Sequence, residues 1–276
     1  MEVTLTLRHG DCLEIMKSIP DKSVDLIICD LPYGCLTGGG ISKPENAKKY
    51  GRKETEGVMI GCSWDIKIPL KPFWDQIRRI RRSDHAPTIH FCTTKFGYEL
   101  IQSNPDEFRY DLVWDKQRGV SFLSANKMPM RSHEMIYVFS KAGAFYERKD
   151  IEGDFKEHKQ YGKAKSDSTY GIVNRKKPVT RPIGTITSTA DKRCVLSVIQ
   201  QHGSLKKGNH PTEKPCDLYR FLIDRYCPVG GTVLDPTAGS FNSVFTAYEM
   251  NRSAIGIEKN DTFYKKAEER LKKITT

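Results

Sequence analysis

An apolar run that ends in a carboxylate and a proline constrains this chain most. Residues 24–29 are mainly aliphatic, and Asp30, Leu31, Pro32 and Tyr33 follow directly. A short apolar run bounded by a proline turn is typical of a buried strand. The four residues are therefore expected at the carboxyl end of that strand, where ligands bind in open α/β sheets.

These residue types suit the activation of an amino group. An amino nitrogen conjugated to a purine or pyrimidine ring is a poor nucleophile, because its lone pair is delocalised into the ring. The Asp30 carboxylate can accept one N–H, and a backbone carbonyl kept out of a strand ladder by Pro32 can accept the other. Tyr33 offers a ring face to an unstacked base. A plain strand end with Tyr33 as wall packing is the alternative.

A second strand–loop–helix pattern lies near the other end of the chain. Residues 231–235 read as a strand, a loop of small residues follows, and residues 241–250 read as a helix. Another strand then ends at Glu258. Gly239 lets the backbone approach a ligand, and an acidic residue about twenty positions further on accepts hydrogen bonds from ribose hydroxyls. The loop lacks the G-x-G-x-x-G spacing of dinucleotide sites.

Two further segments carry polar residues at element boundaries. Asp11 follows an alternating strand at residues 4–8 and opens a short helix, so it serves as an N-cap or contacts a ligand. Thr212 can cap the helix predicted over 216–226, whose N-terminus is a natural seat for a carboxylate. Further strands are predicted at 87–92, 110–114 and 135–139 and helices at 73–82 and 93–103. The irregular residues 34–61 are predicted to form a mobile lid, with a disordered loop as the alternative.

The distribution of charge indicates a polyanionic partner. The chain of 276 residues has a formal net charge of +11, and residues 141–209 hold 15 Lys and Arg against 7 Asp and Glu. Tyrosines are interleaved with these charges, whose densest groups are Arg175-Lys176-Lys177 and Lys192-Arg193. Such asymmetry favours a phosphate-facing element, and a disordered insert is the alternative.

Composition excludes several other classes of protein. A content of 38% hydrophobic and 29% charged residues fits a soluble globular chain with one large domain. No apolar run approaches membrane-spanning length and no signal peptide is evident, so a cytoplasmic protein is expected. The eight cysteines show no C-x-x-C pairing, which predicts neither a metal site nor a disulfide framework. A cysteine that adds to a pyrimidine ring is the sharper alternative.

Taken together, these motifs resemble the amino-group DNA methyltransferases that use S-adenosylmethionine. The segment 30–33 is similar to that family's D/N/S-P-P-Y/F/W motif, with Leu31 in place of the first proline. Residues 210–215, His-Pro-Thr-Glu-Lys-Pro, match its H-P-T-E/Q-K-P signature. Residues 235–241 are similar to its D-P-F-x-G-S-G loop, with Phe241 in place of the last glycine. Trp64-Asp65, residues 114–116 and residues 131–134 also match its layout, and the order of motifs is that of its permuted β class.

The resemblance implies a Rossmann-like α/β fold with a mostly parallel sheet of about seven strands. Residues 1–140 would form the catalytic half, 141–209 an inserted target-recognition segment, and 210–276 the cofactor-binding half, with strands from both chain ends in one sheet. The catalytic residues implied are Asp30, Pro32 and Tyr33. The S-adenosylmethionine site would comprise Asp11, Cys12, Asp30, His210, Thr212, Lys214, Asp235, Ala238, Gly239, Ser240 and Glu258. DNA would contact Arg175, Lys176, Lys177, Lys192 and Arg193.

The activity implied is methyl transfer to adenine N6 of a base flipped out of double-stranded DNA, by a monomer or homodimer. An Asp at position 30 favours adenine, because Ser more often accompanies cytosine N4 enzymes of the family. Cytosine N4 methylation is one alternative. A non-catalytic nucleic-acid-binding subunit with a vestigial fold is another. RNA is a further candidate substrate and is less favoured than DNA. A separate restriction endonuclease acting on the same site would be a partner of such an enzyme.

Overall fold

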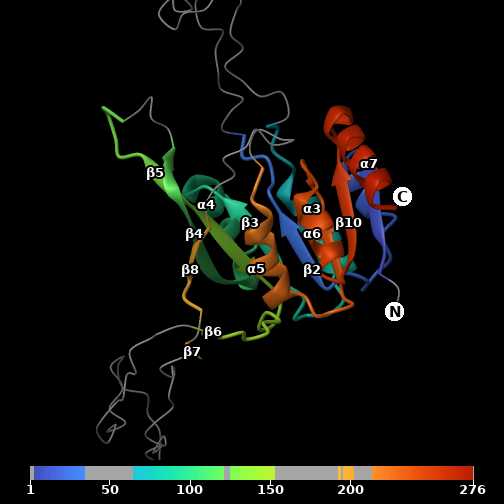
Figure 1. Cartoon of the computed structure of the whole chain (residues 1–276), viewed down its shortest axis with the longest axis horizontal. Coiled ribbons are helices and arrows are strands. Elements are labelled where there is room, and N and C mark those ends of the chain that lie inside the picture. The colour runs from blue at the N-terminus through green and yellow to red at the C-terminus, as the bar shows by residue number, and fades with distance from the viewer. Residues whose placement is uncertain are drawn as a thin grey trace, which may run out of the picture. The chain divides into compact units, whose positions relative to one another are not determined.

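A mixed eight-stranded sheet forms the centre of the computed structural model, which describes residues 3–34, 65–120, 125–152, 192–193, 195–201 and 213–275. The strand order is β1-β10-β9-β2-β3-β5-β4-β8, and Figure 1 shows most of these strands side by side. The strands are β1 (Leu5–His9), β2 (Leu26–Cys29), β3 (Thr88–Cys92), β4 (Phe108–Val120), β5 (Arg131–Phe139), β8 (Val198–Gln200), β9 (Thr232–Asp235) and β10 (Ser253–Glu258).

All neighbouring strands run parallel except β5, which is antiparallel to both β3 and β4. Strands β1, β10, β9, β2 and β3 therefore end at one edge of the sheet, and β4 ends there too. The sheet joins the first strand of the chain to the last two, as the permuted order of motifs predicts. Both chain ends thus contribute to one edge.

Alternating side chains of the central strand belong to two separate cores. Leu26 and Ile28 pack into one apolar cluster, and Ile27 and Cys29 pack into the other. Because successive side chains of a strand point to opposite faces, this alternation means that both faces of β2 are covered. All four residues are fully buried, which explains why the segment reads as a continuous apolar run.

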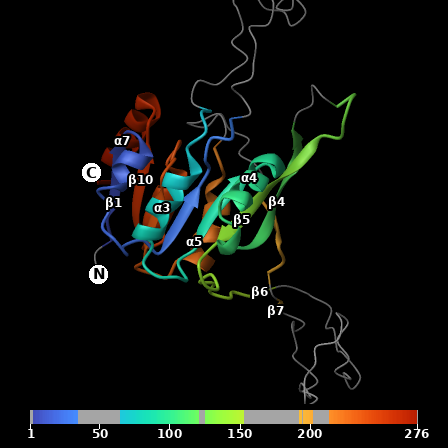
Figure 2. The same ribbon diagram turned by 180° about the vertical axis from the view of Figure 1, so that it is seen from behind.

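Helices cover each face of the sheet. The helices α5 (Cys216–Tyr226), α6 (Asn242–Glu249) and α7 (Asp261–Thr275) contribute to the first cluster, whereas α1 (Cys12–Met16), α3 (Leu70–Ile80) and α4 (Thr94–Ser103) contribute to the second. Figure 2 shows α3 and α4 from the face opposite to α5. A 3-10 turn, η2 (Pro105–Glu107), precedes β4. No helix in the described part of the chain has the length and apolarity needed to cross a bilayer.

A second compact unit comprises residues 148–196, and the first comprises residues 1–147 and 197–276. Within the second unit, the described residues include a two-stranded antiparallel ladder of β6 (Ile151–Glu152) and β7 (Lys192–Arg193). The predicted recognition segment had the wider bounds 141–209. Its residues 198–200 instead form β8 of the main sheet, because Ile199 is buried against that sheet's core.

Three features of the fold differ from the sequence expectation. The sheet has eight strands rather than about seven, since β8 was not predicted. Strands β4 and β5 are longer than predicted and pair as far as Val120 with Arg131. Helix α7 was not predicted. The predicted lid, the tryptophan of the Trp64-Asp65 pair and the basic cluster at 175–177 lie outside the described residues.

Candidate active site

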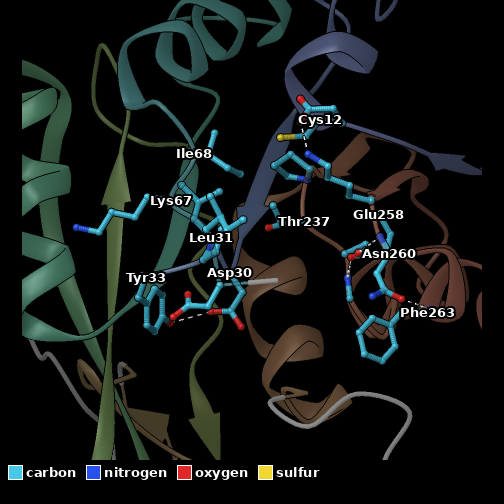
Figure 3. A pocket seen from close by; sticks show the side chains of 18 of the residues that line it. Cys12, Asp30, Leu31, Tyr33, Lys67, Ile68, Thr237, Glu258, Asn260 and Phe263 are labelled. Carbon is cyan, nitrogen blue, oxygen red and sulfur yellow. Dashed lines mark hydrogen bonds and ion pairs between the residues drawn. The ribbon is translucent and has the colours of Figure 1, made fainter. Parts of the chain in front are cut away.

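A cavity of about 600 Å³ lies at the edge where the parallel strands end. Its wall comes from residues immediately after β1, β2 and β9 and from the last residue of β10, as the general rule for α/β sheets predicts. Figure 3 shows Asp30 and Tyr33 on one side, and Glu258, Asn260 and Phe263 on the other. The lining consists of segments 10–13, 30–33, 65–69, 213–214, 236–240 and 258–260, with Glu134, Tyr219 and Phe263.

One end of the cavity is built around the Asp30 carboxylate. Its Oδ1 accepts a hydrogen bond of 2.8 Å from the Tyr33 hydroxyl, and its Oδ2 accepts one of 2.6 Å from Lys214 Nζ. The Tyr33 ring packs against Phe96 with centroids 5.2 Å apart. Leu31, at the position of the family's first proline, is 2% exposed and belongs to the core. That position therefore contributes shape rather than a polar contact.

Two lysines and a second carboxylate complete this end. The Lys214 ammonium is buried and lies 3.4 Å from Glu134 Oε2, while Lys116 donates to Glu134 Oε1. Burial opposes the charge on Lys214, yet Asp30 and Glu134 raise its pKa above the ordinary value. Burial likewise opposes ionisation of Glu134, but the two lysines lower its pKa below the ordinary value. Both groups are therefore charged at neutral pH.

The other end is built around Glu258, the last residue of β10. Its Oε2 accepts a hydrogen bond of 2.9 Å from the Gly239 N–H, and its Oε1 accepts one of 2.6 Å from the Asn260 N–H. These bonds leave a lone pair on each oxygen. Phe263, in the first turn of α7, places a ring beside this carboxylate (Figure 3). A carboxylate next to an aromatic ring and to glycine backbone in the cavity wall suits a nucleoside.

The loop between β9 and α6 lines the cavity with the small residue Gly239, whereas its large side chain, Phe241, points away from the cavity. Phe241 has the left-handed φ of 59°, where the family pattern has glycine. Its ring is fully buried in the core and is not part of the cavity wall. The ring fits because residue 256 is glycine: a Cβ there would lie 2.7 Å from Phe241 Cδ1.

Asp235 is buried directly before this loop. Its carboxyl accepts hydrogen bonds from the Thr237 N–H and the Ser243 hydroxyl. Burial raises its pKa to about 7 against those two bonds, and the charges of Asp30 and Glu258 contribute in the same direction as burial. The carboxyl does not line the cavity and supports the loop from beneath.

Asp11 and Cys12 flank the Glu258 end. Asp11 caps α1 by accepting from the Leu13 N–H and pairs with Lys259 Nζ at 3.1 Å, and these bonds lower its pKa despite the opposing effect of burial. Burial raises the pKa of the Cys12 thiol to about 12. A thiol that stays protonated is a poor nucleophile, which disfavours this cysteine as a residue that adds to a base.

Most of the predicted site residues in the described ranges meet at this cavity. They are Asp11, Cys12, Asp30, Pro32, Tyr33, Lys214, Ala238, Gly239, Ser240 and Glu258. His210 and Thr212 lie outside the described residues, as do Arg175, Lys176 and Lys177. Lys192 and Arg193 form β7 in the second unit. Within the described ranges, no group of three His, Cys, Asp or Glu side chains could hold a metal ion.

Sequence reasoning missed several residues of the cavity wall. Glu134 was noted only as part of a motif that also contains His133, and the structure shows that Glu134 is the one facing the cavity. Lys259, Asn260 and Phe263 were missed together with α7. The signal available for them was their position, because residues that directly follow an acidic strand end open the next helix at the same sheet edge.

Comparison with known proteins identifies a family model and related sequences that match nearly the whole chain. The N6/N4 family model, described as a DNA methylase, matches residues 24–269. The Type II methyltransferase M.HindIII of Haemophilus influenzae is 45% identical over an alignment of 315 positions that covers 95% of this chain and 94% of that protein. The DNA adenine methyltransferase YhdJ of Escherichia coli is 26% identical over 274 residues, covering 96% of this chain and 82% of its own length.

A solved structure shows the same fold. The cytosine-N4-specific PvuII DNA methyltransferase superposes with a TM-score of 0.59 at 14% identity, covering 95% of this chain and 84% of that chain. The match to the family model includes both Asp30 and Glu258. Both ends of the cavity thus fall within the region shared with the family.

Proposed function

The chain belongs to the N6/N4 DNA methylase family, and from this premise we propose that it transfers a methyl group from S-adenosylmethionine to adenine N6 of a base extruded from duplex DNA. The observation that carries the proposal is the cavity with two chemically different ends. Glu258 and Phe263 form an end that suits a nucleoside. Asp30 and Tyr33 form an end that suits an amino group on an aromatic ring.

The residues of the Glu258 end fit the adenosine part of S-adenosylmethionine. The free lone pairs of Glu258 can accept hydrogen bonds from ribose hydroxyls, and Phe263 can pack on the adenine ring. Gly239, with a φ of 50°, brings backbone close to this place without a side chain. When bound, the sulfonium of this cofactor supplies an electrophilic methyl group. The cavity volume also suits a ligand of this size.

The residues of the Asp30 end would orient the acceptor nitrogen. Asp30 accepts one N–H of the amino group, which directs the remaining lone pair out of the hydrogen-bonding plane and towards the methyl donor. The Tyr33 hydroxyl fixes the carboxylate by donating to its Oδ1. Positioning of this kind supplies a large part of the rate in bimolecular transfer. A base reaches this depth only after leaving its stack, which costs a few kcal/mol.

A basic hairpin supports duplex DNA as the partner. Strand β4 runs parallel to β2 and β3, so its carboxyl end and the start of β5 lie at the sheet edge where β2 and β3 end, and they project past it (Figure 1). Residues 117–133 contain three Lys and Arg, which are Arg118, Lys127 and Arg131, and no Asp or Glu. A two-stranded ribbon fits the major groove. Together with the basic cluster at 175–177, the hairpin would contact phosphates.

Adenine is preferred over cytosine because residue 30 is Asp, and the adenine-specific YhdJ matches almost the whole chain. Cytosine N4 methylation is the second candidate, and it is favoured by the structural likeness to the PvuII enzyme. The same amino-group geometry serves both bases. The similarity to the Type II methyltransferase M.HindIII also favours a companion restriction endonuclease acting on the same DNA site.

The test is transfer of tritium from methyl-labelled S-adenosylmethionine to unmodified bacterial DNA, followed by digestion and separation of nucleosides. We expect label in N6-methyldeoxyadenosine. Asp30→Ala should lower the rate by about 10²–10³-fold and leave the dissociation constant for S-adenosylmethionine nearly unchanged. Label in N4-methyldeoxycytidine would support the second candidate. Absence of label with the wild-type protein would favour a non-catalytic DNA-binding subunit.

A further inference from the structure

Four charged side chains form one network at the Asp30 end of the cavity. Lys214 Nζ lies 2.6 Å from Asp30 Oδ2 and 3.4 Å from Glu134 Oε2, and Lys116 donates to Glu134 Oε1. Two positive and two negative groups compensate one another. The Lys214 side chain is 5% exposed and the Asp30 side chain 23% exposed, so the pair is shielded from water but opens onto the cavity.

The two carboxylates are unequally satisfied. Both oxygens of Asp30 accept a hydrogen bond, one from Tyr33 and one from Lys214. Glu134 Oε2 is buried and has no hydrogen-bond partner among the described residues. Its distance from Lys214 Nζ is about 0.6 Å longer than an ordinary charge-assisted hydrogen bond. A buried carboxylate oxygen that has only this long ionic contact and no hydrogen bond is incompletely satisfied, so it can accept the ammonium as a second partner.

The lysine and the incoming amino group act on the same carboxylate. An ammonium on Asp30 Oδ2 withdraws electron density from the carboxylate, takes one of its acceptor positions and so weakens it as an acceptor for an amino N–H. An amino group on a base is a neutral donor, which cannot displace an ammonium unless that charge finds another carboxylate. Glu134 provides one at the distance given above. The movement needs only the side chain, since the Lys214 carbonyl is held by Asn242 Nδ2 at 3.3 Å.

We propose, on the basis of the proposed function, that Lys214 is a positioning residue that exchanges partners during the reaction cycle. Its ammonium neutralises Asp30 while the cavity holds no base. When the base enters, the ammonium moves to Glu134 Oε2, and the amino group takes its place on Asp30. The network keeps the same total charge in both arrangements, and after the exchange both oxygens of Asp30 still accept a hydrogen bond, one from Tyr33 and one from the amino group.

Two single substitutions separate this exchange from a fixed structural contact. Glu134→Gln removes the charge that draws the ammonium away, and it is expected to lower kcat by about ten- to a hundredfold with little change in KM for DNA or in Kd for S-adenosylmethionine. Lys214→Arg keeps the charge, but its planar fork can bind both carboxylates at once. We expect it to fold normally and to lower kcat similarly. Full activity of Lys214→Arg would contradict the exchange.

A double substitution tests whether Glu134 acts through Lys214. Lys214→Met removes the exchanging group, so adding Glu134→Gln to it should lower kcat by less than about threefold further. Unfolding midpoints measured on all variants report structural damage separately. If the fold loss of kcat in the double variant equalled the product of the losses in the two single variants, the two residues would act independently and the proposal would be overturned.

A structural measurement tests the exchange without methyl transfer. In the crystal structure of Asp30→Asn without a base, the amide oxygen attracts the ammonium less than Glu134 does, so the Lys214 Nζ to Glu134 Oε2 distance should shorten from 3.4 Å to about 2.8 Å. An ammonium that stays on residue 30 would overturn the proposal. This distance can be measured without methyl transfer. If the wild-type protein transferred no methyl group, the proposed function would be rejected, and the measured distance would still test the exchange.

Discussion

At the scale of single residues, Asp235 shows how burial raises the pKa of a carboxyl that directly precedes the loop between β9 and α6. Its pKa of about 7 means that the folded protein retains a proton between about pH 4 and pH 7 that the unfolded chain has lost. The free energy of unfolding contributed by this group is therefore complete below pH 4 and is lost as the pH rises through 7. The carboxyl thus stabilises the fold only in acid.

Asp235→Asn should remove this pH dependence. The amide oxygen can still accept from the Thr237 N–H, and the side chain has no proton to lose. We expect the free energy of unfolding of the variant, relative to wild type, to rise by on the order of 2 kcal/mol between pH 5 and pH 8. Urea denaturation at the two pH values measures it. A difference that does not vary with pH would show that Asp235 titrates normally.

At the scale of elements, α7 contributes a wall of the cavity that the sequence did not reveal. Its apolar positions are few and its charges many, so its pattern is that of a solvated tail. Tyr264, Ala267 and Leu271 nevertheless pack against the first core cluster. This contact places Phe263 beside Glu258. The helix is defined by tertiary packing rather than by its own hydrophobic period.

Phe263→Ala should weaken cofactor binding. Losing an aromatic face costs about 0.5–1.5 kcal/mol, so the Kd for S-adenosylmethionine is expected to rise by up to about tenfold in isothermal titration. Tyr98→Ala, which truncates an aromatic residue that is 61% exposed on α4, is the matched control. If both variants bind the cofactor like wild type, the adenosine end of the cavity has been assigned wrongly.

The hairpin of β4 and β5 gives a prediction about DNA. Replacing exposed Arg118 and Arg131 by Gln should weaken DNA binding and lower the slope of log K against log salt by up to about 2, since each phosphate contact contributes about 0.9. As a control, Lys17→Gln with Lys273→Gln removes the same charge from the residue that follows α1 and from α7. Equal slopes for the two double variants would assign the hairpin no phosphate contacts.

At the scale of the whole molecule, the sequence predicts strand ends well and contacts between distant side chains poorly. Asp30 and Glu258 were placed at one sheet edge because apolar runs and small-residue loops mark the ends of parallel strands. The ion pair of Lys214 with Asp30 spans 184 positions and depends on how side chains pack. Strand β8 has only three residues, of which Ile199 alone is buried. It is therefore too short to show the alternation of hydrophobic and polar residues by which a strand is predicted.

The basic cluster at 175–177 belongs to the same scale, because its contribution to DNA binding is expected to add to that of the hairpin. Changing Arg175, Lys176 and Lys177 together to Gln should weaken DNA binding and reduce the salt slope by up to about 3. Methylation of saturating DNA should be less affected than methylation of dilute DNA. An unchanged salt slope would mean that this cluster does not face phosphates.

The central claim is that one cavity holds the methyl donor at Glu258 and the acceptor nitrogen at Asp30. A crystal structure of the protein with S-adenosylmethionine tests it most directly. We expect the ribose hydroxyls on the Glu258 carboxylate, the adenine against Phe263, and the sulfonium methyl directed towards Asp30. Electron density for the cofactor away from this edge of the sheet, or a methyl group facing away from Asp30, would contradict the account.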